Sequence, residues 1–299
     1  MHHDALIIGG SFAGLSAALY LARARKSVCV VDAGAPRNRF AATSHGFFAQ
    51  DGSDPQAMLQ TMRRQVAAYP TVGFLTDTAV EAREDDGLFQ VALRSGALVT
   101  GKRLLLAFGI SDVMPETPGL AERWGTSVLH CPYCHGYEFS GRPLGVLNTS
   151  PLSHHQAMMI SEWGPTTLYL DGGDLETEHH DALARRGIRI EPAAVDRLTG
   201  EGRNLSHIHL ADGRSCPLEA LFIAPRNRLN SAIAGQIGCA IEAGPLGSTI
   251  KVDEMRMTSA ANVFAAGDIT RTAHNVTFAC ADGVMAAVAM HRSLVFEAA

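Results

Sequence analysis

Hydrophobic and polar positions alternate along this chain in short segments, and the lengths of these segments predict strands and helices in turn. An apolar run at residues 5–8 is followed by a glycine-rich turn at 9–14 and a helical pattern at 15–24. The β-branched run at 27–32 then predicts a second strand. This order has the length of a βαβ unit of the kind that binds nucleotides.

The remainder of the chain continues the alternation. Ser53, Asp54 and Pro55 are typical of a helix start, and this helix is expected to end near Tyr69. Short alternating runs over residues 72–106 predict a small β-meander. Further strands are expected at 143–148, 166–170 and 261–266, and further helices at 154–163, 175–186 and 279–294. Segments near 112–119 and 238–251 are expected to be domain boundaries.

Composition narrows the class of protein. A chain of 299 residues with 46% hydrophobic and 18% charged residues suits one large or two medium globular domains. The net charge of −5 and the lack of a basic run argue against binding to nucleic acid or to an anionic membrane surface. Residues 5–22 carry no charge, but no Lys or Arg precedes them and Gly9, Gly10 and Ser11 interrupt the run. We therefore expect neither an export signal nor a membrane span.

The six cysteines are unevenly spaced. Four are isolated and are expected to be small buried hydrophobic residues: Cys29, Cys216, Cys239 and Cys280. Without an export signal, a reducing, cytoplasmic location is expected and structural disulfides are not. Cys131 and Cys134 differ from the others because only two residues separate them.

The stretch around this pair, HCPYCHGYE at residues 130–138, allows three chemical interpretations. Cys-x-x-Cys-His is the attachment pattern of c-type haem, but haem c requires export and a distal ligand. Zinc would need a second pair of ligands, and two adjacent histidines, at 154–155 or at 179–180, cannot easily chelate one ion from a regular element. No metal is therefore expected. We favour a redox-active dithiol at a helix start, with one thiol pKa lowered by the helix dipole.

Two segments point to a dinucleotide. The turn Gly9-x-Ser11-x-x-Gly14 has serine in place of the usual middle glycine, and such a turn offers backbone N–H groups to a pyrophosphate. The residues expected there are Gly9, Ser11, Phe12, Ala13 and Gly14. Asp32 ends the second strand, where a carboxylate bonds a ribose hydroxyl. Residues 262–268 form an apolar strand that ends in Gly267 and Asp268, and this aspartate can reach the ribityl and pyrophosphate groups of FAD.

With these motifs in place, the chain resembles the thioredoxin-reductase-like flavoproteins. The first glycine turn, Ala107-Phe108-Gly109, the Cys-x-x-Cys and Gly267-Asp268 occur in that family's order over most of the chain. The resemblance implies non-covalent FAD, with Ala107 and Gly109 joining the residues above and with His274 and Asn275 facing the flavin. It implies an α/β fold of two Rossmann-like three-layer domains: an FAD-binding domain of residues 1–113 and 241–299, and a smaller inserted domain of residues 114–240 that carries the redox pair. It also implies a homodimer.

The chain departs from this family at its second nucleotide turn. In residues 144–152 only one glycine remains, and Pro151 has no N–H. The expected arginine cluster is replaced by DGGDLETE at 171–178, whose four carboxylates would repel a phosphate; Asp171 alone could suit NADH. DAGAPRNRF at 32–40, SHGFF at 44–48 and CPYCHGYE resemble a subgroup that lacks these motifs. That subgroup includes dithiol oxidases of bacterial and fungal natural products, and reductases fed by other donors.

The resemblance assigns roles to the redox motif. Cys134 is expected to lie against the flavin, Cys131 to exchange with substrate, and His135 to move protons near neutral pH. The favoured function is oxidation of a dithiol, on a small molecule or a small redox protein, with electrons passing through the cysteines to FAD and then to oxygen or another acceptor. The alternatives are a disulfide reductase fed by ferredoxin, a second flavin or NAD(P)H, and a non-catalytic redox sensor.

Overall fold

The structure, a computed structural model, describes residues 2–296 of the chain. The chain folds into two compact units. Unit 1 comprises Met1–Arg37, Gln56–Ser111 and Arg228–Ala299, and unit 2 comprises Asn38–Pro55 and Asp112–Asn227. The chain changes from one unit to the other within β7 (Ile110–Val113) and within β16 (Arg226–Leu229), and these two strands form a two-stranded sheet.

This division differs from the predicted boundaries in two places. Residues 38–55 were expected in the FAD-binding domain, but they group with unit 2. Arg203 donates a hydrogen bond to the Phe40 carbonyl (2.8 Å), and the backbone at Gly125 packs so closely on Phe40 that a Cβ there would lie 2.9 Å from it. Residues 228–240 were expected in the inserted domain, but Ile233 and Ala234 are buried in the core of unit 1.

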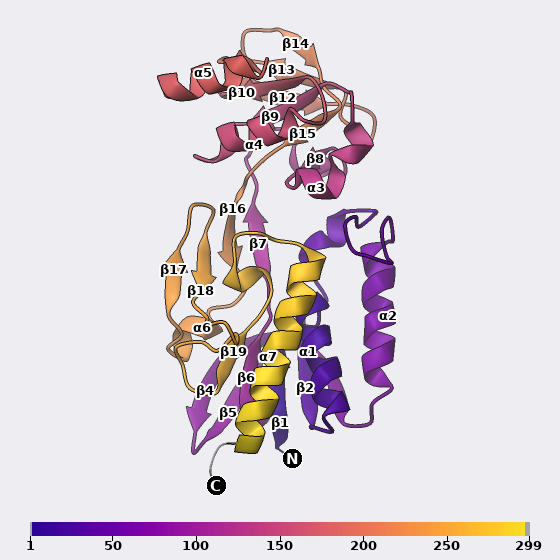
Figure 1. Ribbon diagram of the computed structural model, residues 1–299, viewed down its shortest axis with the longest axis vertical. Helices are drawn as coiled ribbons and strands as arrows, with labels where there is room; N and C mark the ends of the chain where they lie inside the picture. The colour runs from indigo at the N-terminus through magenta and orange to yellow at the C-terminus, as the bar shows by residue number, and fades with distance from the viewer. Residues whose placement is uncertain (1, 297–299) are drawn as a thin grey trace. The chain divides into compact units, whose positions relative to one another are not determined.

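Unit 1 is built on a parallel sheet in the order β3-β2-β1-β6, with β19 also pairing with β6 (Figure 1). These strands are β1 (His3–Ile8), β2 (Val28–Asp32), β3 (Val72–Thr76), β6 (Leu98–Leu106) and β19 (Val263–Ala265). Their buried positions are mostly Val, Ile and Leu, as expected of a sheet covered on both faces. Because the strands are parallel, their carboxyl ends share one edge of the sheet.

An antiparallel extension joins this sheet through β6. β4 (Ala79–Asp85) pairs with β5 (Leu88–Leu93), and β5 pairs with the first half of β6. The predicted meander is therefore right for β4 to β6 and wrong for β3, which pairs in parallel with β2. β6 serves both parts because its residues 98–101 pair with β5 and its later residues pair with β1 and β19.

Two helices cover one face of the sheet with small side chains. α1 (Phe12–Arg23) and α7 (Val276–Phe296) lie side by side (Figure 1), so close that a Cβ at Gly283 would lie 2.1 Å from the Ala13 carbonyl oxygen. Several alanines of these helices are buried in the core cluster on this face: Ala13, Ala17, Ala18, Ala286, Ala287 and Ala289. α7 is the one described helix that is long and apolar enough to cross a membrane by length and composition alone. α2 (Pro55–Ala67) follows the segment 38–55, which belongs to unit 2.

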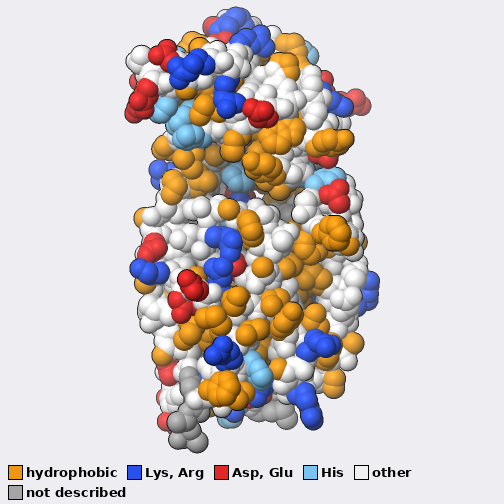
Figure 2. Space-filling model, viewed as in Figure 1, with side chains coloured by type: hydrophobic (Ala, Val, Ile, Leu, Met, Phe, Trp, Pro, Cys, Tyr) orange, Lys and Arg blue, Asp and Glu red, His pale blue; other side chains and the backbone are white. Residues whose placement is uncertain are grey.

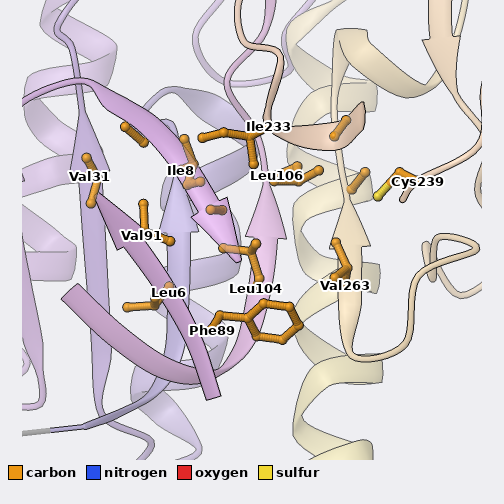
Figure 3. Packing of buried hydrophobic residues seen from close by; sticks show 14 of the residues in the cluster. Leu6, Ile8, Val31, Phe89, Val91, Leu104, Leu106, Ile233, Cys239 and Val263 are labelled. Carbon is orange, nitrogen blue, oxygen red and sulfur yellow. The ribbon is translucent and has the colours of Figure 1, made fainter. Parts of the chain in front are cut away.

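The opposite face of the sheet carries a second hydrophobic cluster. Leu6, Ile8, Leu104 and Leu106 meet Phe89 of the antiparallel extension (Figure 3). α6 (Ile233–Gln236) and the hairpin of β17 (Ile241–Ala243) and β18 (Ser248–Ile250) complete unit 1.

The isolated cysteines only partly follow the prediction. Cys29 and Cys239 are buried, and burial raises the pKa of both thiols. Cys216, in β14, and Cys280, in α7, are only partly buried. Cys29, Cys216, Cys239 and Cys280 are free thiols in the structure.

Unit 2 repeats the layered α/β arrangement on a smaller scale. Its parallel sheet has the order β11-β10-β9-β15-β8. These strands are β8 (Val128–Leu129), β9 (Leu144–Leu147), β10 (Thr166–Tyr169), β11 (Arg189–Glu191) and β15 (Ala220–Phe222). The other elements are α3 (Pro132–His135), α4 (Ser153–Ile160), α5 (Thr177–Arg185), and an antiparallel sheet of β12 (Val195–Thr199), β13 (His207–Leu210) and β14 (Ser215–Pro217). The prediction of an α/β fold with two Rossmann-like domains is confirmed.

Within residues 2–296, short 3₁₀ turns lie between these elements at Arg37–Phe40, Ala121–Arg123, Tyr137–Phe139 and Asp268–Thr270. On the face shown in Figure 2, acidic and basic side chains are interspersed over both units and form no extended basic patch.

Candidate active site

The turn between β1 and α1 has the geometry of a phosphate cradle. Gly9 has φ +114°, and a Cβ there would lie 2.1 Å from the Ala107 carbonyl oxygen. A Cβ at Gly14 would lie 1.8 Å from the carbonyl oxygen of Gly9. Only glycine fits either position. The first turn of α1 carries no acidic side chain, so its N–H groups and its dipole favour an anion.

Asp32 is held against this turn. It ends β2, and a Cβ at Gly10 would lie 2.7 Å from the Asp32 Cβ, so the missing side chain of Gly10 makes room for the carboxylate. The Asp32 carboxylate also lies 3.8 Å from the Arg63 guanidinium. Gly10 was not among the predicted site residues, although its neighbour Gly9 was.

The loop after β19 reaches the same turn. Gly267 has φ +83°, and a Cβ there would lie 3.1 Å from the Ala13 Cβ. Ala107, at the end of β6, donates its N–H to the Ile8 carbonyl (2.8 Å) and places its own carbonyl against Gly9. The structure thus brings together the predicted residues from the ends of β1, β2, β6 and β19.

Arg37 makes polar contacts with two residues of this loop, Asp268 and His274. Its guanidinium lies 3.1 Å from the Asp268 carboxylate and 2.8 Å from His274 Nδ1. Because a guanidinium can only donate, Nδ1 accepts this bond, and Nε2 then donates to the Arg271 carbonyl (2.8 Å). His274 is therefore held as the neutral Nε2–H tautomer. Asn275 has a structural use as well, since its Oδ1 accepts the Phe278 N–H (2.7 Å) and caps α7.

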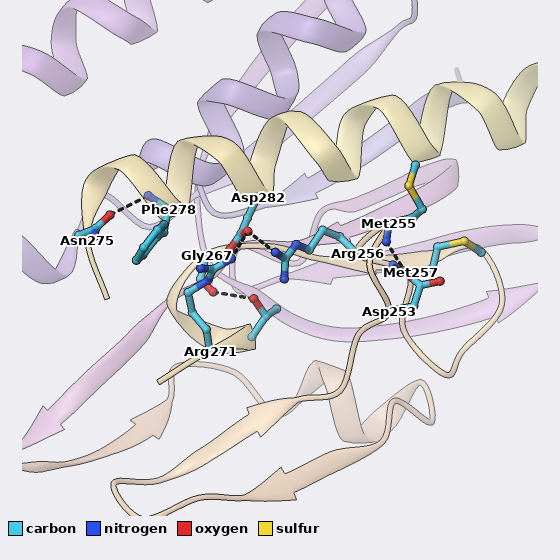
Figure 4. A network of polar contacts seen from close by, with 10 residues as sticks. Asp253, Met255, Arg256, Met257, Gly267, Arg271, Asn275, Phe278 and Asp282 are labelled. Atoms are coloured by element: carbon cyan, nitrogen blue, oxygen red, sulfur yellow. Dashed lines mark hydrogen bonds and ion pairs between the residues drawn. The ribbon is translucent and has the colours of Figure 1, made fainter. Parts of the chain in front are cut away.

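A buried carboxylate on α7 anchors this loop (Figure 4). Asp282 accepts hydrogen bonds from Arg271, whose Nε lies 2.9 Å away, and forms an ion pair with Arg256 at 2.8 Å. The carboxylate is buried, whereas the two arginines keep some exposure. The sequence offered no signal for this network, because its three charges are separated by many residues.

The redox pair lies in unit 2. Cys131 precedes α3 as its N-cap, and the Sγ atoms of Cys131 and Cys134 are 2.7 Å apart, within reach of disulfide formation. α3 is a single turn, and it packs on Trp163 because Gly136 has no side chain: a Cβ there would lie 3.0 Å from the indole ring. Tyr133 contacts the same indole edge-to-face but is largely exposed.

His135 follows Cys134 directly. Burial lowers the pKa of His135, the nearby Glu138 carboxylate opposes this by raising it, and His45 lowers it further. The net direction is downward, so the ring is in its neutral, proton-accepting form near neutral pH. His130 and Glu138 are the first and last residues of the stretch HCPYCHGYE. The His130 ring lies 3.1 Å from the Ile223 carbonyl and its backbone oxygen accepts from Gln156, which makes it structural.

The turn between β9 and α4 resembles the β1–α1 turn in topology but not in chemistry. The N–H groups of Thr149 and Ser150 both donate to the Ser153 hydroxyl at 3.1 Å, and the Leu152 N–H donates to the Ser150 hydroxyl at 3.2 Å. Pro151 has no N–H. The donors that would meet a phosphate here are therefore already used. Asp171, which could have suited NADH, accepts the Val195 N–H at 2.7 Å through Oδ1.

Comparison with known proteins identifies the family. The model of the pyridine nucleotide-disulphide oxidoreductases matches residues 3–291. This chain belongs to that family. Thioredoxin reductase tcpT of Claviceps purpurea is 32% identical over 95% of this chain and 91% of its own length, and thioredoxin reductase sirT of Leptosphaeria maculans is also 32% identical over the same shares.

Solved structures agree with this assignment. The crystal structure of an oxidoreductase from Agrobacterium tumefaciens covers 100% of both chains with 45% identity and a TM-score of 0.95. The crystal structure of HlmI covers 98% of this chain and 93% of its own, with 35% identity and a TM-score of 0.93. The predicted resemblance to thioredoxin-reductase-like flavoproteins is confirmed, and the chain is an FAD-dependent oxidoreductase that acts on disulfides.

The residues of unit 1 fit this cofactor. Gly9 and Gly14 leave space that any Cβ would fill, and the first turn of α1 is open to the pyrophosphate. Asp32 suits a ribose hydroxyl and Asp268 suits the ribityl chain. Arg37 and His45 were missed as individual residues, although both lie in the stretches APRNRF and SHGFF that carried the resemblance.

Proposed function

We propose that this flavoprotein oxidises a dithiol to a disulfide. The observation that carries the proposal is the closed β9–α4 turn, whose backbone donors are taken by Ser153 and Ser150. A pyridine nucleotide needs those donors for its pyrophosphate. The carboxylates of Asp174, Glu176 and Glu178, in the segment that follows β10, add repulsion. Without a nucleotide as electron source, thiols are the reductant that the Cys131–Cys134 pair can accept.

The proposed chemistry divides between three side chains. His135 takes the proton of a substrate thiol, and the resulting thiolate attacks Cys131 of the Cys131–Cys134 disulfide, so that Cys134 leaves as a thiolate. The second substrate thiolate then attacks the substrate sulfur of the mixed disulfide and releases Cys131. Bound FAD supplies a two-electron acceptor for the resulting dithiol, and oxygen or another oxidant is the final acceptor.

An anaerobic titration tests this function. The purified holoenzyme is mixed with a small dithiol, with NADPH and with NADH, and the flavin absorbance is followed. We expect the dithiol to bleach the flavin and both nucleotides to leave it oxidised on the same time scale. Fast bleaching by NADPH would refute the proposal. Cys134→Ser should abolish bleaching by the dithiol, and normal turnover in that variant would contradict the electron path.

A reductase is the second candidate, because the curated relatives tcpT and sirT are named thioredoxin reductases. It would require another donor, such as reduced ferredoxin or a second flavin. In that case the reduced enzyme should reduce a small disulfide protein faster than it reacts with oxygen. A redox sensor would switch its disulfide without turnover with any of these partners.

We also propose that the protein is a homodimer in the cytoplasm. On α7, Phe278, Met285, Val288 and Val295 are exposed at a spacing of seven, three and seven residues, which places them on one helix face. Hydrophobic side chains are visible along α7 in Figure 2. Val288→Glu should yield a monomer in analytical ultracentrifugation, whereas Thr277→Glu on the same helix should not. Cys29, Cys216, Cys239 and Cys280 are free thiols, which supports a reducing compartment.

A further inference from the structure

Residues 44–53 form a closed loop in unit 2 that fixes the position of His45. Ser44 and Ser53 form an antiparallel bridge, in which the Ser44 N–H donates to the Ser53 carbonyl at 2.8 Å. The Gly52 N–H returns to the Ser44 carbonyl at 2.9 Å, and the Gly46 N–H donates to Asp51 Oδ1 at 2.8 Å. His45 is therefore anchored at the base of the loop by backbone bonds on either side.

The ring of His45 lies among the groups that surround the redox motif. Its Nε2 is 3.4 Å from Glu138 Oε1, and its Nδ1 is 3.5 Å from Asp51 Oδ1. It meets the ring of His135 edge-to-face, with 6.3 Å between the centroids. The His45 side chain is 21% exposed and Asp51 is 69% exposed, so these groups lead from the cysteine motif toward solvent.

Electrostatics couples the two imidazoles. His45 lowers the pKa of His135, because two imidazolium ions at this separation repel each other. The Glu138 carboxylate acts in the opposite direction: it raises the pKa of His135, and it also contacts the His45 ring. The Gly46 N–H and the His45 ring lower the pKa of Asp51, which keeps this carboxylate ionised at the outer end.

We propose that His45 is the second member of a proton-carrying histidine pair: His135 takes the proton from the reacting thiol, and His45 passes it to solvent beside Asp51 and Glu138. The proposal rests on the dithiol oxidation proposed above. His45 does not touch the cysteines in this assignment; it acts through His135 and is a positioning and proton-transfer residue.

The proton balance shows why a second base is useful. Oxidation of one dithiol releases two electrons, which remain on the Cys131–Cys134 pair as its disulfide is broken, and two thiol protons. His135 can hold only one of these protons at a time. The second substrate thiol must be deprotonated before the mixed disulfide is resolved, so His135 must first lose the first proton. His45 is the adjacent imidazole, with 6.3 Å between the ring centroids, a separation that calls for an intervening water to carry the proton.

Two variants with opposite predictions test the pair. The rate of anaerobic flavin bleaching by a small dithiol is measured against pH for the wild-type holoenzyme, His45→Gln and Glu138→Gln. Removing His45 removes a group that lowers the pKa of His135, so the acid limb of the profile should move to higher pH. Removing Glu138 removes a group that raises it, so the limb should move to lower pH. His207→Gln and Glu122→Gln, on exposed parts of unit 2, are the matched controls.

The size of the loss in bleaching rate distinguishes a proton-transfer role of His45 from a purely structural role. On the pH plateau, His45→Gln should bleach about tenfold more slowly, less than the ~10²-fold or greater loss expected for a general base itself. Imidazole in the buffer should restore a large part of the rate to His45→Ala but none to the Cys134→Ser variant.

The outcomes also separate this inference from the proposed function. If the wild-type flavin is not bleached by any dithiol, the oxidase proposal fails. If the wild type is bleached, but the two limbs move in the same direction or stay with the controls, the histidine pair is refuted and the oxidase proposal stands.

Discussion

Substitution of Asp282 tests how unit 1 holds the loop of residues 267–274, which contains the FAD-site residues Gly267 and Asp268. The carboxylate is buried on α7 between Arg271 and Arg256, and it is the group that brings their two positive charges together. Asp282→Asn keeps the volume and removes the charge. The two guanidinium groups then face each other without their shared counter-ion.

The expected cost follows from the burial of this network. Removing one partner of a buried ion pair costs about 3–5 kcal/mol because the remaining charge stays desolvated. The arginines keep 22% and 23% side-chain exposure, which favours the lower part of that range. At about 2 °C per kcal/mol for a chain of this size, a cost of about 3–4 kcal/mol should lower the melting temperature by roughly 6–8 °C.

The assay is thermal unfolding together with the FAD content of the purified protein. Asp282→Asn should lose FAD more readily than the wild type, because Arg271, which Asp282 binds, is itself part of the loop of residues 267–274. Asp253→Asn is the control: Asp253 is exposed and accepts two backbone N–H bonds at 2.9 Å, which an amide oxygen also accepts. Adding Arg256→Met to Asp282→Asn should recover part of the loss. Equal, small shifts in Asp282→Asn and Asp253→Asn would refute the reasoning.

Three further predictions concern the FAD site of unit 1 and the redox motif of unit 2. Gly9→Ala should purify largely without FAD, since its Cβ would meet the Ala107 carbonyl and its φ of +114° is strained for alanine; flavin absorbance per protein measures this, and full occupancy would contradict it. Arg37→Met should weaken FAD binding about tenfold through the loss of a charge-assisted bond to Asp268, measured by fluorescence titration of apoprotein; Arg39→Met is its neighbouring control. Burial lowers the folded-state pKa of His135, so its neutral form contributes stability above pH ~6.5 that is lost as the pH falls through the folded pKa. His135→Gln should therefore lose less stability than the wild type between neutral pH and about pH 5, and an unchanged pH dependence of the melting temperature would contradict it.

The flavin turn was predictable from the sequence because its determinants are local. A strand, a glycine turn and a helix follow one another within the first 24 residues, and the close contacts of Gly9 and Gly14 involve the same few turns of chain and the end of β6. The acid at the end of β2 and the Gly267–Asp268 pair could be found in the same way, because each follows a recognisable apolar strand.

The placement of residues 38–55 could not be predicted by that reasoning. Between β2 and α2 the chain has no periodic pattern, and its assignment to unit 2 depends on Arg203 and Gly125, which are distant in sequence. His45 was missed for this reason, because its neighbours Glu138 and His135 become neighbours only through that assignment. β3 was misassigned for a related reason: alternating polarity predicts a strand but not its direction.

The two strand–turn–helix motifs of this chain show how the same topology can be open or closed to a phosphate. In unit 1, three glycines remove side chains where the turn meets β6 and Asp32, and the helix start is left without an acidic group. In unit 2, the Ser153 hydroxyl accepts two of the N–H groups that would bind a phosphate. Replacing Ser153 by glycine would free those two donors but would restore neither the N–H that Pro151 lacks nor a positive charge near Asp174, Glu176 and Glu178. Ser153→Gly should therefore still resist reduction by NADPH, and rapid flavin bleaching in that variant would mean that the hydroxyl alone closes the site.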